Sequence, residues 1–471
     1  MSGWGTIYNQ TQYSLKTWSE SLARLQEQAS SGERIVRASD EPGTAYQIMS
    51  LRDTQSSVTT YTSNIAEIQR RYKNADTALQ SMDDIISQVR QLVSQAASGA
   101  MPAETRTPIG QQVNALLEQA VQLANDGSLG SYTFGGADMA TPPYQAVREN
   151  GQIVRVDYVG SMQNTQVPVG PGAQYAGTLV GDRIFRSSQP GQITFYGNSG
   201  VTPGSGTPSV RGDVWLTLTH DTTTFDASTG LAAGDSSAAD DTILGDHNIT
   251  IDALAKTITL DNGTAVSFDG SETDLELVNS DGDKVHVNMT GWSGAGGTST
   301  VSATGLASLD DGATTTAITR TDNLAVTDSR TGQVLFVNTT DIQRTGTEPG
   351  RISGSYDLFS ELASIRDLLT NARGLDQQKQ LQMLSECEGS LQEVATGVVQ
   401  GLTLVGGKIQ SMTTLQTSLQ SVSDNAKSQA DQLQDTDVIS VATELARTQT
   451  LYQMTLTSAA KLLQMNLLDY I

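Results

Sequence analysis

The chain has 471 residues, a net charge of −23 and an aromatic content of 5%, which is low for a protein with a large compact core. The acidic balance argues against a nucleic-acid partner, which needs a basic face. The single cysteine, Cys387, excludes an intrachain disulfide. No apolar run approaches the roughly 20 residues of a membrane span, and the first residues lack a signal-peptide pattern. These rules alone predict a cytoplasmic protein without membrane insertion.

The first stretch is predicted to be an amphipathic helix. Its apolar residues alternate steps of three and four, the spacing of a coiled-coil seam; they are Tyr8, Leu15, Trp18, Leu22, Leu25 and Ala29. Gly32 is expected to end this helix in the left-handed conformation. After a short extended segment, Ser39 or Asp40 is expected to cap a second helix. Pro42 then falls in the first turn, where a missing N–H costs little.

The second helix is predicted to be long. Its apolar residues keep the same spacing from Val58 to Ala96, a seam of about 58 Å at 1.5 Å per residue. A helix of that length needs a partner along it. Thr107 and Pro108 are expected to start a third helix, which ends at 125–127.

The pattern changes between about Tyr144 and Arg351. Short segments of alternating polarity lie between turns rich in Gly, Asp, Asn and Ser, which predicts antiparallel strands. Two turns, at 261–263 and 280–283, have the composition of hairpin turns. The stretch 291–312, almost entirely Gly, Ser, Thr and Ala, is expected to be a loop or an internal linker. Together these features predict one or two antiparallel β modules.

Helical periodicity returns after Gly354. A short helix is predicted around 358–369 and a long one from Asp376 to Leu433. Four glycines weaken the long helix by about 1 kcal/mol each relative to alanine. A close approach by another backbone would explain them; they are Gly397, Gly401, Gly406 and Gly407.

The last stretch is predicted to be a helix with Thr436 as its N-cap and Asp437 in its first turn. Its apolar residues recur at helical spacing; they are Val438, Val441, Leu445, Tyr452, Leu456, Ala459, Leu463, Leu467 and Tyr470. An apolar helix face must be buried, and the candidate partner is the first helix.

These elements predict an α+β multidomain fold. Long N- and C-terminal helices pair into a coiled-coil-like helical bundle, and a central antiparallel all-β insertion lies between them. We expect a terminal coiled-coil assembly domain (1–35 and 438–471), a helical bundle domain (36–144 and 353–437) and a central β domain (145–352). Because the terminal domain is thin, its segments are expected to be marginal in the monomer and to gain order by packing against copies of themselves.

The chain shows no pattern of catalytic or metal-ligating residues, so we predict that it is not an enzyme and uses no cofactor or metal. The three histidines, His220, His247 and His286, lack metal-binding spacing. The acidic turn at 280–283 fits a hairpin better than a calcium loop. Cys387 lies among leucines of the long helix and is expected to be a buried structural thiol.

Both ends of the chain resemble the bacterial flagellin superfamily. At the N-terminal end the resemblance lies in the turn Ser31-Gly32-Glu33-Arg34-Ile35 and in the helix start Ser39-Asp40-Glu41-Pro42. At the C-terminal end it lies in Asp435, Asp437 and the Leu-Leu finish. The two blocks stand at the ends of the chain and in the order that this superfamily has.

Within the superfamily the chain is most similar to the hook–filament junction branch. Pro42 stands where filament flagellins usually have alanine, and the block from Gly130 to Tyr144 resembles the segment that leads from helix to β domain in junction members. The resemblance implies a flagellin-like, hook-associated structural subunit of the bacterial flagellum that joins hook to filament and serves motility. It also implies type III secretion of the unfolded chain, so a secreted protein replaces the cytoplasmic prediction.

The resemblance implies several partners: copies of the chain itself in a helical ring or tube, a neighbouring hook-associated protein, flagellin and a flagellar export chaperone. Self-assembly must be head-to-tail so that the contacts propagate. The predicted assembly interface consists of Leu15, Trp18, Leu22, Leu25, Val441, Leu445, Tyr452, Leu456, Leu463 and Leu467. The predicted turn and start of the second helix depend on Gly32, Arg34, Ser39, Asp40 and Pro42.

Two alternatives stay open. A filament flagellin would have the same terminal helices and would be found along the whole filament. A surface adhesin or glycan-binding protein would act through residues 145–352, and that fragment would then bind its ligand.

Overall fold

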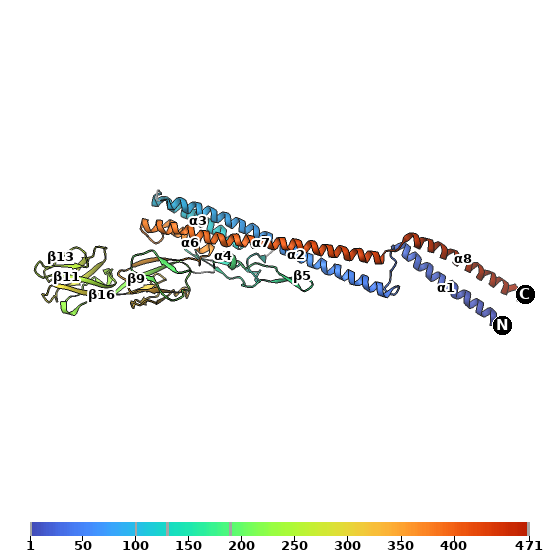
Figure 1. Cartoon of the computed structure of the whole chain (residues 1–471), viewed down its shortest axis with the longest axis horizontal. Coiled ribbons are helices and arrows are strands. Elements are labelled where there is room, and N and C mark those ends of the chain that lie inside the picture. The colour runs from blue at the N-terminus through green and yellow to red at the C-terminus, as the bar shows by residue number, and fades with distance from the viewer. Residues whose placement is uncertain (1, 99–100, 129–130, 188–190, 469–471) are drawn as a thin grey trace. The chain divides into compact units, whose positions relative to one another are not determined.

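The computed structural model describes residues 2–98, 101–128, 131–187 and 191–468; the side chains at 2–5, 128 and 462–468 lie outside this description. Helices occupy both ends of the chain and strands fill its middle (Figure 1). The long helices are α1 (Ser2–Ser31), α2 (Pro42–Ala97), α3 (Ala103–Ala124), α6 (Leu358–Thr370), α7 (Gln377–Gln434) and α8 (Val438–Leu468). The predicted α+β class, with a central antiparallel insertion between long terminal helices, is confirmed.

The strands and short helices between α3 and α6 begin with three two-stranded hairpins and a single turn of helix. They are β1 (Gly127–Ser128), β2 (Ser131–Tyr132), β3 (Tyr144–Glu149), β4 (Gln152–Tyr158), β5 (Gln166–Gly170), β6 (Ala173–Ala176), α4 (Asp182–Phe185), β7 (Ile193–Phe195), β8 (Thr202–Pro203) and β9 (Gly212–Phe225). They continue with η1 (Ala227–Thr229), β10 (Ala232–Ala233), α5 (Ser237–Asp240), β11 (Gly245–Asp252), β12 (Thr257–Leu260) and β13 (Val266–Ser267). The last are β14 (Leu275–Val278), β15 (Lys284–Asn288), β16 (Gly297–Ser308), β17 (Thr316–Ala317), β18 (Leu324–Thr327), β19 (Val334–Asn338) and β20 (Gly346–Ile352).

The β insertion is built on one large sheet with the strand order β13-β12-β11-β16-β9-β20-β7, to which β17 adds at β16. Two three-stranded sheets, β10-β15-β14 and β18-β19-β8, accompany it. Two separate hydrophobic cores form, one around Leu216 and Leu335 and the other around Ile249 and Leu277. The insertion therefore contains two β modules, where the sequence predicted one or two.

The expectation of a loop or linker at 291–312 is wrong for most of that stretch. Strand β16 runs through it and pairs with β11 on one side and β9 on the other. Val301, Ala303 and Ala307 are buried, and exposed Ser and Thr residues alternate with them. Because the inward side chains are so small, the period of two that marks a strand is hard to distinguish from a linker composition.

Both predicted hairpin turns are present. At 261–263, Asp261 has a positive φ of 45° and the Gly263 N–H donates to the Leu260 carbonyl at 2.8 Å. At 280–283, Gly282 has a φ of 87°, which only glycine adopts without strain. This second turn closes the β14–β15 hairpin, in which Val278 pairs with Lys284.

The chain divides into two compact units. One contains 1–71, 166–177 and 407–471, and the other contains 72–165 and 178–406. In the first unit the β5–β6 hairpin contacts α2, because the Asn64 side chain donates to the Pro168 carbonyl at 2.9 Å. In the second unit α3 lies along α6, and the β modules are part of the same unit.

The long apolar seam predicted for α2 is confirmed. The apolar residues predicted for this seam, from Val58 to Ala96, are buried except Tyr61, which is half-buried. The eight seam residues from Tyr72 to Ala96 are each at most 1% exposed. In α7 the seam is confirmed from Leu384 to Leu419, with half-buried positions among buried ones. Val422, predicted to belong to that seam, instead is 44% exposed.

The glycines of α7 fall into two kinds. A Cβ added at Gly397 would lie 3.0 Å from the Ile184 carbonyl, and one at Gly401 would lie 2.7 Å from an Ile184 methyl. A close approach by the backbone of α4 therefore explains Gly397, as predicted, whereas at Gly401 the close neighbour is the Ile184 side chain. Neither contact explains Gly406 and Gly407, where an added Cβ would meet nothing within 4 Å.

The third helix starts earlier than predicted. Helix α3 begins at Ala103 after Pro102, so Pro108 lies inside the helix instead of at its first position. The first turn is held by the Pro102 carbonyl, which accepts from the Thr105 N–H at 3.1 Å and from the Thr105 hydroxyl at 2.7 Å. Pro108 is the sixth residue of α3, beyond the first four N–H groups that lack a partner inside a helix, so the helix continues there without an N–H to donate to the Glu104 carbonyl.

Five aromatic residues gather where the helices meet the first strands. Tyr144 has ring centroids of Tyr158, Phe185 and Phe359 within 4.9–5.9 Å, and Phe134 contacts Phe185 at 5.1 Å. Aromatic residues are few in this chain. At this point the cluster forms the hydrophobic core, whereas aliphatic side chains form the seams of the long helices.

A buried charged network lies at the base of the β insertion. The Arg351 guanidinium on β20 lies 3.0 Å from Asp213 on β9 and 3.1 Å from Glu361 on α6. It also donates to the Met383 carbonyl at 3.0 Å and to Ser390 Oγ at 3.1 Å, both on α7. One arginine thereby connects two strands with two helices.

The same network accounts for Cys387. Its thiol is fully buried and accepts from Arg351 Nη1 at 2.9 Å. Burial raises the pKa of Cys387 well above its ordinary value, so the thiolate that a nucleophile needs is disfavoured. The predicted buried structural thiol is confirmed. Burial also raises the pKa of Glu361, against the opposing effect of the Arg351 charge.

Candidate assembly surface

Helices α1 and α8 lie side by side and antiparallel (Figure 1). Near their junction the Thr436 N–H donates to the Gly32 carbonyl at 3.0 Å, and the Arg34 N–H donates to the Gln434 carbonyl at 2.6 Å. A short antiparallel bridge joins Glu33 and Asp435. The end of α1 is thus fixed beside the start of α8, which brings the two ends of the chain together as the apolar stripes predicted.

The seam between the two helices follows the spacing of three and four. On α1, Leu15, Trp18 and Leu22 are half-buried and Leu25 is buried, whereas Tyr8 and Ala29, predicted for the same seam, are exposed. On α8 the covered positions are Val441, Leu445, Thr448, Leu451, Tyr452, Thr455 and Ala459, whereas Val438, predicted for the same stripe, is 53% exposed. Sequence reasoning overlooked the two threonines because it followed apolar residues only; the spacing itself pointed to positions 448 and 455.

The predicted interface residues thus divide into three groups. Leu15, Trp18, Leu22, Leu25, Val441, Leu445 and Tyr452 are covered within one chain. Leu456 is 44% exposed. The side chains of Leu463 and Leu467 lie outside the described residues, although both positions belong to α8. Most of the predicted set therefore pairs α1 with α8 in the same subunit.

Besides Leu456, further apolar side chains stay uncovered on this pair. Tyr13 is 74% exposed, Ile439 80%, Met454 63% and Leu456 44%. We call these four the outer apolar residues. Counted from the seam, Tyr13 stands on the far side of α1, and Ile439 and Met454 stand on the outer positions of α8. The α1–α8 contact does not need them, so they are available to another surface.

The paired helices are also nearly neutral. Helix α1 has two basic and two acidic residues, and α8 has two basic and one acidic. The whole chain has a net charge of −23, which makes copies repel one another. The α1–α8 pair is therefore a part of the surface at which two copies can meet with little repulsion.

The turn after α1 is organised by Gly32 and Arg34. Gly32 has a φ of 73°, as predicted for the residue that ends the helix, and its N–H donates to the Gln28 carbonyl at 2.9 Å. The Arg34 side chain donates to the Leu433 carbonyl at 3.1 Å and pairs with Glu41 at 2.5 Å. Arg34 thus connects the turn with the end of α7.

The start of α2 is as predicted at Pro42, its first residue, but the expected cap is wrong. Ser39 and Asp40 lie in a turn before the helix, and the Asp40 carboxylate accepts from the Arg37 N–H at 2.9 Å. Glu41 is the residue directly before the helix. Hydrogen bonds from Thr44 and then Arg34 lower the pKa of Glu41.

The predicted cap of α8 is off by one residue. Asp437 accepts from the N–H groups of Ile439 at 3.0 Å and Ser440 at 3.2 Å, so Asp437 is the N-cap. The Thr436 N–H instead donates a hydrogen bond to the Gly32 carbonyl. The same region has a small core of Ile35, Ala45 and Ile48, with Leu433 packed against it.

Two histidines of the β insertion lie in internal pairs with aspartates. His286 Nδ1 lies 2.9 Å from Asp241, and His247 Nδ1 lies 2.7 Å from Asp261. In the part of the chain that the structure describes, no group of three or more His, Cys, Asp or Glu side chains has the geometry of a metal site. Across the same residues, no helix has the length and apolar character that a membrane span requires.

Two comparisons of sequence bear on these observations. Residues 5–136 match the family model described as the bacterial flagellin N-terminal helical region. The flagellar hook-associated protein 3 of Escherichia coli strain K12 is 25% identical over 183 residues, which are 38% of this chain and 55% of that protein. The chain therefore spans about half the length of the curated relative it matches.

Two solved structures are similar to this chain at low sequence identity. FlgL of Xanthomonas campestris is 17% identical and covers 78% of this chain and 99% of its own, with a TM-score of 0.40. Flagellar hook-associated protein 3 of Legionella pneumophila is 14% identical and covers 82% and 98%, with a TM-score of 0.45. The family match at the N-terminal end and the curated relative confirm the resemblance to flagellins: the chain is similar to the bacterial flagellin N-terminal helical region over residues 5–136 and to a flagellar hook-associated protein 3.

Proposed function

We propose that this protein is a structural subunit of the bacterial flagellum that assembles through its paired terminal helices and joins the hook to the filament. The observation that carries the proposal is the α1–α8 pair, which is nearly neutral and leaves the outer apolar residues uncovered. The flagellin match over residues 5–136 supports the flagellar role. The name of the curated relative supports the hook-associated position.

Assembly in this proposal occurs in two layers. Within a chain, the seam that includes Leu25 and Val441 pairs α1 with α8. Between chains, the outer apolar residues pack against neighbours in a head-to-tail ring or tube. Fully burying each such side chain contributes roughly 1.5–3 kcal/mol, which helps to offset the entropy of fixing one subunit beside another. Residues 1–35 and 438–471 form the assembly domain, 36–144 and 353–437 the bundle, and 145–352 the outward β domain.

The proposal includes further partners. A neighbouring hook-associated protein lies on one side of the junction and flagellin on the other, and an export chaperone holds the chain before secretion. The exposed apolar side chains of α1 and α8 are the surface that a chaperone would cover, because free helices with such residues aggregate.

The deciding experiment is immunogold electron microscopy of flagella from cells that produce the chain with an epitope inserted after Leu254, which is 99% exposed. Label confined to a short zone at the hook–filament boundary supports the junction role. Label along the whole filament would make the chain a filament flagellin. Label on the cell surface away from flagella would favour an adhesin.

A further inference from the structure

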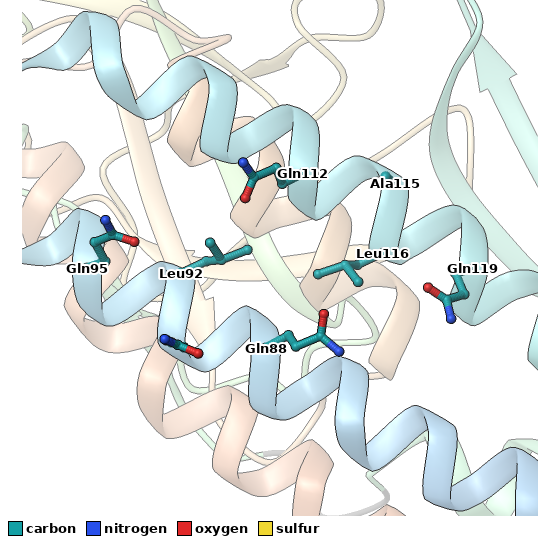
Figure 2. A pocket seen from close by; sticks show the side chains of 8 residues that line it. Gln88, Leu92, Gln95, Gln112, Ala115, Leu116 and Gln119 are labelled. Atoms are coloured by element: carbon teal, nitrogen blue, oxygen red, sulfur yellow. The ribbon is translucent and has the colours of Figure 1, made fainter.

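A hollow on the outer face of the helices lies between α2 and α3. Its volume is about 430 Å³, and it is lined by Gln88, Gln91, Leu92 and Gln95 from α2 and by Gln112, Ala115, Leu116 and Gln119 from α3. Figure 2 shows Leu92 and Leu116 between the two helices, with glutamine side chains along both. We call it the glutamine groove. All its residues belong to the second compact unit.

The two walls of the groove repeat one sequence pattern. Residues 88–95 read QVRQLVSQ and residues 112–119 read QVNALLEQ. In each, the valine is fully buried in the helical core, while the two outer glutamines and the central leucine line the groove. The groove therefore has an apolar floor, amide rims and no charged residue in its lining. An amide donates and accepts hydrogen bonds, so the rims suit a neutral polar surface.

A matching ridge is present on α7 of the same unit. From Val394 to Gly406 the helix has no charged residue. Val399, Thr403 and Gly406 follow one another at steps of four and three, so they share one face of the helix. Val399 is 48% exposed, and Thr403 and Gly406 are exposed as well. At Gly406 an added Cβ would meet nothing within 4 Å. This face is uncharged and low in profile, and no part of it lines the groove.

The ridge and the groove match in length and in charge. Gln88 to Gln95 and Val399 to Gly406 each contain eight residues, or about 10 Å along a helix. A helix that meets two others packs its ridge of side chains into the groove between them. For a chain with a net charge of −23, faces without charge are the places where copies approach without repulsion.

We propose that the glutamine groove receives the Val399–Gly406 face of α7 from a second copy of this chain. The inference rests on the self-assembly proposed above and adds a lateral contact to it. Because groove and ridge are different surfaces of one subunit, the contact is heterologous and propagates from copy to copy. It therefore fits a ring or tube, which a groove-on-groove dimer would not.

Disulfide trapping tests the contact directly. The natural thiol, Cys387, is fully buried, so it can stay in place. Gln91→Cys and Thr403→Cys are placed in one chain, and full-length protein is concentrated at high salt, which screens repulsion between copies. After mild oxidation we expect a ladder of covalent multimers on a non-reducing gel. Equal mixtures of the two single variants should give dimers only, and Gln91→Cys with Leu254→Cys should give no ladder.

Three other outcomes of the cross-linking experiment would each contradict one part of the proposal. Dimers from Gln91→Cys alone would show a groove-on-groove contact and overturn the ridge assignment. Assemblies that pellet without any cross-link would overturn the groove as a contact. A wild-type chain that stays monomeric at every concentration would instead overturn the proposed function, because self-assembly itself would be absent.

Charge placement gives a second, independent measurement. Gln91→Glu and Thr403→Glu together put like charges on both faces and should weaken association about tenfold or more. Gln91→Glu with Thr403→Lys should restore it. Both positions are exposed, so the monomers should fold alike. Equal association by the two double variants would overturn the contact.

Discussion

The Arg34 side chain donates to the main-chain carbonyl of Leu433 at 3.1 Å, although the two residues are 399 positions apart in the chain. Together with the Gly32–Thr436 and Arg34–Gln434 hydrogen bonds, this contact holds the end of α1 beside the start of α8. These hydrogen bonds therefore fix the point at which the pairing of α1 with α8 begins, and they set the register of the seam between the two helices.

Replacing Arg34 should loosen this turn. Arg34→Ala removes the hydrogen bond to Leu433 and the ion pair with Glu41, whose side chains are 46% and 47% exposed. The loss should be about 0.5–1.5 kcal/mol, since solvent screens the ion pair. Hydrogen exchange at the amides of 435–441 should accelerate more than in Arg37→Ala, which breaks only an exposed pair with Glu27. Equal acceleration in both variants would contradict the assigned role of Arg34.

The buried network predicts a large effect at Arg351. Arg351→Met leaves the carboxylates of Glu361 and Asp213 buried without their cation, which should cost about 3–5 kcal/mol in chemical denaturation. Arg148→Met, which breaks an exposed pair with Glu118, should cost at most about 1 kcal/mol. Similar losses in both variants would mean that Arg351 does not hold the β insertion to the helices.

The same variant should respond to pH. Burial raises the pKa of Glu361 in the folded state, and removing Arg351 leaves that effect unopposed. A carboxyl group whose folded pKa exceeds its unfolded pKa stabilises the protein below the unfolded value and loses that stabilisation as pH rises. The deficit of Arg351→Met should therefore be smaller at pH 5 than at pH 8; a larger deficit at pH 5 would contradict this.

The two kinds of glycine in α7 predict opposite results for one substitution. Gly401→Leu forces a side chain against Ile184 and should destabilise by about 1–3 kcal/mol through overpacking. Gly406→Leu meets open space and should stabilise the monomer by up to about 1 kcal/mol, since leucine favours helix more than glycine does. Thermal unfolding of the two variants measures both. A reversed order would overturn the explanation given for Gly401.

Asp310 predicts an acid-sensitive loop in the β insertion. Its carboxylate accepts from Ser329 Oγ at 2.6 Å and from the Thr314 N–H at 2.8 Å, and these bonds lower its pKa. A lowered folded pKa gives stabilisation that is present above the ordinary value of 3.8 and is lost as pH falls below it. Asp310→Asn should therefore lower the Tm at pH 7 and lower it less below pH 3.8. A deficit that grows on acidification would contradict this, and the exposed Asp53→Asn is the control.

The helical half of the fold could be predicted because its signal is periodic. The seam of α2 repeats over many turns, so single irregular residues do not obscure it, and Gly32 and Pro42 mark helix ends by backbone geometry. Strand β16 was not predicted, because the small residues Val301, Ala303 and Ala307 give only a weak alternation of apolar and polar side chains. Cap positions were shifted at Asp437 because Thr436 and Asp437 are both good caps.

The candidate site was only partly predictable. The spacing of Leu15 to Leu25 indicates a seam but not whether its partner is in the same chain or in another copy. Arg351 could not be recognised at all, because its partners Asp213, Glu361 and Ser390 come from distant segments. The glutamine groove likewise could not be predicted, because it forms only where α2 and α3 lie side by side.

The most direct test of the central claim is sedimentation of the full chain against variants of the outer apolar residues. Wild-type protein at high concentration should form large assemblies. Tyr13→Asp and Ile439→Asp should leave the chain monomeric, with unchanged helical circular dichroism because neither side chain lies in the α1–α8 seam. Leu254→Asp, which changes a still more exposed apolar residue in the β insertion, should assemble as wild type does. If Tyr13→Asp and Ile439→Asp assemble as well as Leu254→Asp, the paired terminal helices are not the assembly surface.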